Sequence, residues 1–66
     1  MLIKIDHDNY HSLTATEKAV IAFINANPEK IATMSISMLA EQTYSSPATV
    51  SRTIKKCGID GFAELR

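Results

Sequence analysis

The stretch from Ser35 to Ile59, SISMLAEQTYSSPATVSRTIKKCGI, decides the fold because it contains two short helical patterns separated by a polar turn. Leu39 and Ala40 are the inward positions of the first pattern. In the second pattern, Val50 and Ile54 are four residues apart, as on one face of a helix. These four apolar side chains can meet where the two helices cross. The stretch therefore predicts a pair of short helices packed at a corner.

Capping signals mark the ends of both helices. Ser35 is the expected N-cap of a helix over residues 36–43, and residues 44–45 form the turn. Ser46 and Pro47 place an N-cap and a proline at the start of the second helix, which continues until Gly58 stops it.

Upstream of the pair, the sequence predicts two more helices. Thr14 and Glu17 form a capping box for a helix over residues 15–26. That helix ends at Asn27 because proline disfavours the helical conformation of the residue before it, and Pro28 also suits the start of a short helix. Met34 and Met38, which follow, are expected to fill the core or an interface.

Downstream, Asp60 is the expected cap of a last short helix, in which Phe62 and Leu65 supply the buried contacts. The fold class is therefore all-α: a compact five-helix domain over residues 13–66 that contains a helix-turn-helix and has no wing. Residues 1–12 form an N-terminal arm that precedes this domain.

Composition limits the classes of protein to consider. The chain has 66 residues, of which 45% are hydrophobic and 21% charged, as expected for one small globular domain. A single cysteine excludes an internal disulfide and a cysteine-based zinc site. No apolar run reaches the roughly 18–20 residues of a membrane span, and the N-terminus lacks the apolar core of a signal peptide. We expect a cytoplasmic protein.

Charge is distributed unevenly along the chain. The formal net charge is zero, which alone argues against a strongly cationic nucleic-acid binder. Between Gln42 and Ile59, however, the charged residues are Arg52, Lys55 and Lys56, and no acid accompanies them. The second helix of the pair is therefore basic in a neutral protein.

A basic helix of this kind fits the major groove of B-DNA, where residues near its N-terminus reach base edges and flanking groups hold phosphates. Arg52 is the candidate for a guanine contact, while Lys55 and Lys56 suit phosphate neutralisation. The candidate DNA-binding residues are Ser46, Pro47, Ala48, Thr49, Ser51, Arg52, Lys55 and Lys56.

Several of these residues also have a purely structural interpretation. Ser46 serves as an N-cap, and Thr49 can support the same first turn. The two lysines are what a helix end favours near the negative end of its dipole. Pro47 and Ala48 offer base edges only apolar contact. The residues alone therefore leave DNA binding and a structural role open.

Catalysis has no support in the sequence, because no phosphate loop, paired-carboxylate motif or nucleophile elbow is present. Cys57 is expected to be a small hydrophobe, since its candidate bases, His7 and His11, belong to the polar N-terminal arm. The same two histidines would need further ligands to form a metal site. We predict no enzymatic activity, no cofactor and no metal.

Three strings resemble the N-terminal domain of RpiR-type bacterial transcriptional regulators: LTATEKAV at 13–20, NPEKIATMSISMLAE at 27–41 and SSPATVSRTIKKCGIDGFAELR at 45–66. In that family, a segment with the glycine-phenylalanine pattern of residues 58–65 closes a helical DNA-binding domain. The string TVSR also occurs in LacI-type repressors, but the long N-terminal helix and the string NPEKIATMSI favour the RpiR family.

The resemblance implies a following sugar-isomerase-type domain that binds a phosphosugar effector, and assembly into a dimer or larger oligomer. This chain would then be a DNA-binding domain excised from a longer regulator. It departs from the family pattern at Tyr44, where glycine is common, at Ser45, where an apolar residue is usual, and at Thr53, where an aromatic one is frequent. At Tyr44 we expect a different turn backbone or a positive φ.

The predicted function is sequence-specific binding of double-stranded DNA by a dimeric regulator of sugar or phosphosugar metabolism. The alternative is a helical protein-interaction module that uses this fold without DNA. The zero net charge and the apolar tip formed by Pro47 and Ala48 favour that alternative.

Overall fold

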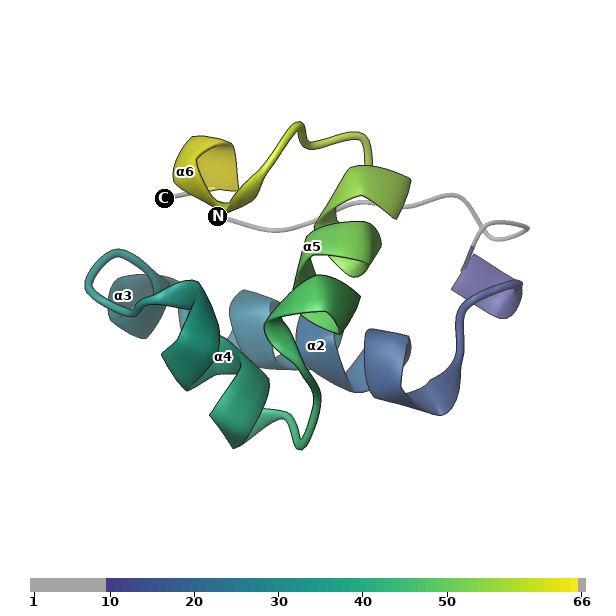
Figure 1. Ribbon diagram of the computed structural model, residues 1–66, viewed down its shortest axis with the longest axis horizontal. Coiled ribbons are helices and arrows are strands. Elements are labelled where there is room, and N and C mark those ends of the chain that lie inside the picture. Colours follow the sequence, from purple (N-terminus) through teal and green to yellow (C-terminus); the bar gives the residue numbers. More distant parts are fainter. Residues whose placement is uncertain (1–9, 66) are drawn as a thin grey trace.

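The computed structural model describes residues 10–65, and all the regular elements it assigns there are helices (Figure 1). They are α2 (Ala15–Ala26), α3 (Pro28–Ile31), α4 (Ile36–Gln42), α5 (Pro47–Lys56) and α6 (Phe62–Leu65). The all-α fold class is thereby confirmed. The predicted helix over 36–43 is one residue shorter, because Thr43 forms its C-cap.

α5 is the central element of the fold. It crosses α2 and packs beside α4, as Figure 1 shows. Val50 and Ile54 of α5 and Leu39 of α4 have no exposed surface. Val20 and Ile24 of α2 complete this core with 0% and 1% exposure. The predicted corner contact between the two helices of the pair is confirmed, and α2 closes it from the other side.

Hydroxyl caps begin the three longer helices. The Thr14 hydroxyl accepts from the Glu17 amide at 3.1 Å, and the Glu17 carboxylate accepts from the Thr14 amide at 2.8 Å, which completes the predicted capping box. Ser35 caps α4 by accepting from the Met38 amide at 3.1 Å. Ser46 caps α5 in the same way.

α4 and α5 end in the same backbone motif. After α5, the Gly58 amide donates to the Lys55 carbonyl and the Ile59 amide to the Ile54 carbonyl, with Gly58 at φ +85°. This is the Schellman pattern, which requires a left-handed residue. After α4, Tyr44 takes the place of that glycine at φ +54°. Its amide donates to the Glu41 carbonyl at 3.2 Å.

Ser45 completes the motif after α4, since its amide donates to the Ala40 carbonyl at 2.8 Å. Of the two alternatives expected at Tyr44, a different turn backbone or a positive φ, the structure has the positive φ. The helix-turn-helix therefore keeps an ordinary helix-ending backbone, although the residue in the left-handed position is not glycine.

We expect Tyr44→Gly to raise the free energy of unfolding by about 0.5–1 kcal/mol. A left-handed conformation costs a non-glycine residue roughly 1–2 kcal/mol, and the freedom of glycine in the unfolded chain cancels part of that gain. The tyrosine side chain is 95% exposed, so little packing is lost. Urea denaturation followed by circular dichroism measures the change. Tyr44→Ala keeps a Cβ atom and should show no such gain; equal gains for both variants would rule out backbone strain.

Polar side chains replace the apolar anchors expected at two family positions. The Ser45 hydroxyl lies 2.8 Å from the Thr43 hydroxyl, which itself donates to the Leu39 carbonyl at 2.8 Å. Thr53 is fully buried, and its hydroxyl donates to the Thr49 carbonyl at 2.8 Å. Burial of these groups is tolerated because each hydroxyl is hydrogen-bonded.

The last helix begins later than the sequence suggested. α6 starts at Phe62, so Gly61 directly precedes it and the prediction that Asp60 is its cap is wrong. The turn that follows α5 extends to Ile59, which delays the helix start. Leu65 is buried and Phe62 packs partly against the core, as predicted.

Candidate nucleic-acid interface

The candidate DNA-binding residues lie on the outward side of α5 and at its N-cap, Ser46. Six of the eight are exposed, Thr49 and Ser51 are half-buried, and none is buried. The opposite side holds Val50, Thr53 and Ile54, which are the buried residues of the helix. The core contacts of α5 therefore fix which side of the basic helix faces outward. We call this outward side the α5 outer face.

A short polar network organises the N-terminal half of the α5 outer face. The Ser46 hydroxyl accepts from the Thr49 amide at 3.2 Å and lies 3.0 Å from the Thr49 hydroxyl. An Arg52 guanidinium nitrogen donates to the same Thr49 hydroxyl at 3.4 Å. The N-cap role of Ser46 is confirmed. This weak hydrogen bond places the arginine near the N-terminal turn, which is the end of a recognition helix that reaches base edges.

The C-terminal end of α5 is joined to α2 by an ion pair that the sequence patterns do not predict. Lys56 Nζ lies 2.8 Å from Glu17 Oε2. The Glu17 side chain is 4% exposed, and its other carboxylate oxygen accepts from the Thr14 amide. A buried carboxylate needs such partners. The only sequence signal was the capping box, which placed Glu17 on α2 but said nothing about its partner 39 residues later.

These contacts lower the pKa of Glu17 from its ordinary value of 4.5, chiefly through the hydrogen bond from Lys56 and then through the Thr14 amide. Because the folded pKa is the lower one, the carboxylate contributes stability above the unfolded pKa. That contribution disappears as the pH falls through the folded value.

We therefore expect the free energy of unfolding to fall more steeply below about pH 4.5 in the unaltered chain than in Glu17→Gln. Chemical denaturation at a series of pH values measures both curves. Glu41→Gln, which removes an exposed acid, is the control and should follow the unaltered chain. Parallel curves for the unaltered chain and Glu17→Gln would contradict the linkage.

The described surroundings of Cys57 do not activate its thiol. The side chain is half-buried, and burial, followed by the negative charge of Glu17, raises the pKa of the thiol above its ordinary value of 9.0. A thiol of this kind is a poor nucleophile at neutral pH. Among residues 10–65 there is no group of three His, Cys, Asp or Glu side chains that could hold a metal. His7 lies outside the described residues.

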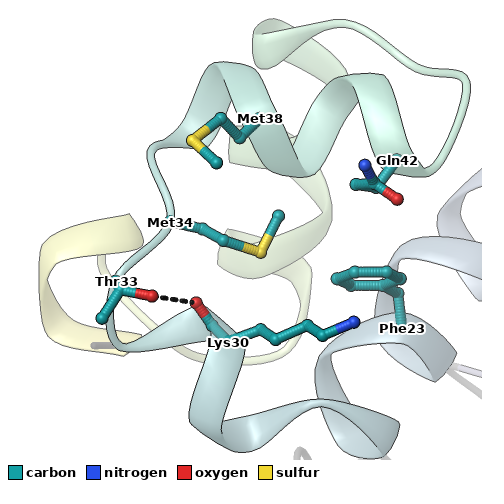
Figure 2. A pocket seen from close by; sticks show the side chains of 6 residues that line it. All are labelled: Phe23, Lys30, Thr33, Met34, Met38 and Gln42. Carbon is teal, nitrogen blue, oxygen red and sulfur yellow. Dashed lines mark hydrogen bonds between the residues drawn. The ribbon is translucent and has the colours of Figure 1, made fainter.

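The two methionines differ in their environment. Met34 is buried in the core, whereas Met38 is 50% exposed. Both line an open pocket of about 250 Å³ between α2, α3 with the segment that follows it, and α4. Figure 2 shows Lys30 extended toward Phe23 along this pocket. Among the described residues that line it, Lys30 is the one ionisable group.

The fold and the α5 outer face together define a helix-turn-helix DNA-binding domain, in which α4 and α5 are the helix pair. The rpiR-family helix-turn-helix model matches residues 1–66, so the chain belongs to the RpiR family of transcriptional regulators. A helix-turn-helix domain of this family is regulatory and not enzymatic.

A curated relative agrees with this family. The chain is 34% identical over 53 residues to an uncharacterized HTH-type transcriptional regulator of Clostridium perfringens. The match covers 80% of this chain and 19% of the relative, so the chain spans less than a fifth of that protein's length. No solved structure gave a significant match. In the described part of the chain, no helix has the length and apolar character needed to cross a membrane.

Proposed function

We propose that the domain binds specific sequences of double-stranded DNA by placing α5 in the major groove. The observation that carries the proposal is the α5 outer face, on which an arginine and lysines stand without a neighbouring acid on the helix. The buried residues of α5 hold this face outward, so the helix enters the groove without rearrangement of the core.

Seven of the eight candidate residues have roles that follow from their places on or beside α5. Pro47 and Ala48 occupy the first turn, where they offer apolar contact, for example with a thymine methyl group. Arg52, one turn later, donates to O6 and N7 of a guanine. Ser46, Thr49 and Ser51 bind phosphates through their hydroxyls together with the helix N-terminal amides. Lys55 neutralises a phosphate.

The complete protein acts as a homodimer in this proposal. Two recognition helices on one side of the duplex would read half-sites about 10 bp, or a multiple of that, apart. The relative's greater length supports a further domain beyond this one. We propose that this domain is of the sugar-isomerase type, binds a phosphosugar, and makes the protein a cytoplasmic regulator of sugar or phosphosugar metabolism.

Selection of binding sites from a random DNA pool, at low and then at moderate salt, tests the proposal. The expected result is an enriched sequence whose affinity falls steeply with salt. A fusion to a dimeric coiled coil should be selected in parallel, because one half-site binds weakly and a second adds effective concentration. If neither form shows salt-dependent affinity for any DNA, the chain is a helical protein-interaction module, which its zero net charge also suits.

A further inference from the structure

The two lysines at the end of α5 have different surroundings although they are adjacent in the sequence. Lys56 follows buried Thr53 by three residues, so it lies at the edge of the helix next to the core. Lys55 follows Ser51 by four residues and Ala48 by seven, which places it at the centre of the α5 outer face. Only the edge position is near α2.

Glu17 of α2 faces the edge of α5 at which Lys56 lies. Its two carboxylate oxygens have different partners: one accepts from the Thr14 amide at 2.8 Å and the other contacts Lys56 Nζ at 2.8 Å. The side chain is nearly inaccessible to water, whereas the Lys56 side chain is 48% exposed. The capping box therefore orients the carboxylate, and the oriented carboxylate holds the lysine.

Withdrawing Lys56 from this pair would leave a buried carboxylate without its cationic partner. Loss of one partner from a buried pair is costly, because the remaining charge is not solvated. A phosphate on DNA would have to compete with this preformed partner for the same ammonium group. Lys55 has no such competitor on its own helix, since α5 contains no acid.

We infer that Glu17 is a positioning residue for DNA recognition, which locks the C-terminal end of α5 onto α2 and keeps Lys56 off the phosphates. This inference rests on the proposed function. It revises the site predicted from the sequence. Lys56 then holds α5 against α2, and Lys55 is the lysine that binds a phosphate at this end of the helix.

Matched lysine variants test the division of roles. Lys55→Met should lower the slope of log affinity against log salt by about one, as expected for the loss of one phosphate contact. Lys56→Met makes the same chemical change at the next position and should leave the slope unaltered. A drop of about one for Lys56→Met would overturn the inference.

Positioning predicts a further effect on specificity. Glu17→Gln and Lys56→Met should each lower the ratio of specific to nonspecific affinity by about two- to tenfold, and the double variant should be no worse than either single one, because both remove the same contact. Additive losses, or an unchanged ratio in Glu17→Gln, would show that the pair is merely structural. If Lys56→Met folds poorly because Glu17 is left unpaired, the double variant, which also removes that charge, replaces it in the comparison.

Hydrogen exchange in the free chain separates this inference from the proposed function. The Cys57 and Gly58 amides, which bond to carbonyls in the last turn of α5, should exchange faster in Glu17→Gln, while the amides of α4 should not. Absence of DNA binding by the unaltered chain would defeat the proposed function alone. Unchanged exchange at Cys57 and Gly58 would show that the Glu17–Lys56 pair does not hold the end of α5, which would defeat the inference itself.

Discussion

Ile54→Ala should remove about 2–5 kcal/mol from the free energy of unfolding, the usual cost of truncating a large buried aliphatic side chain. Ile54 has no exposed surface and lies on the side of α5 that packs against α2 and α4. A domain of this size has a total stability of only about 3–10 kcal/mol, since folded proteins have roughly 0.05–0.15 kcal/mol per residue. The substitution should therefore remove a large share of the total stability of the domain.

The measurement is urea denaturation followed by far-ultraviolet circular dichroism, in which helices give a strong negative signal. Lys55→Ala is the matched control, because it truncates an exposed residue next to Ile54 on the same helix. Its stability should stay within about 0.5 kcal/mol of the unaltered chain. An Ile54→Ala variant as stable as this control would mean that α5 is not packed as the structure shows.

The helices could be predicted because their boundaries are set by neighbouring residues. Thr14 and Glu17 are three residues apart, and the hydrogen bonds between them form within one turn of chain. Ser46 and Pro47 define the start of α5 in the same local way. Buried positions such as Val50 and Ile54 followed from helical spacing. The helix-turn-helix itself needed only that the apolar faces of α4 and α5 meet.

Contacts between distant residues could not be predicted from these patterns. The capping box accounted for Glu17 within its own turn, so nothing in the sequence called for a second partner. Its pairing with Lys56 depends on the angle at which α5 crosses α2, which is a property of the whole packed domain. The same packing changes how the α5 outer face is interpreted, because Lys56 was predicted to contact DNA. Whether Lys56 contacts DNA stays a prediction, which the salt dependence of DNA binding by Lys55→Met and Lys56→Met tests.

Neutral net charge and a basic recognition helix are compatible because the acids lie elsewhere. Glu29 and Glu41 are exposed on other segments, and Glu17 of α2 is buried and paired with Lys56. At physiological ionic strength the Debye length is about 8 Å, so exposed acids beyond that distance weaken a phosphate contact only slightly. The distribution of charge over the surface therefore matters more for DNA binding than its sum.

Arg52→Ala should abolish discrimination at one base pair of the selected site, a loss of roughly 1–3 kcal/mol. The arginine is exposed, and one of its guanidinium nitrogens donates a 3.4 Å hydrogen bond to the Thr49 hydroxyl. A guanidinium group has five N–H donors, so this weak contact leaves most of them for a base. The same hydrogen bond limits the positions that the side chain samples, which lowers the entropic cost of reaching the groove.

Arg52→Lys separates base reading from simple charge. Lysine keeps the positive charge but lacks the planar pair of donors that matches O6 and N7 of guanine. The salt slope of this variant should therefore stay close to that of the unaltered chain, while preference at the contacted base pair falls. Arg52→Ala should lose the preference as well. Affinities for the selected site and for each single-base variant of it give both quantities. If Arg52→Lys and Arg52→Ala keep the full preference at every position, the arginine binds phosphate and another residue of α5 reads the bases.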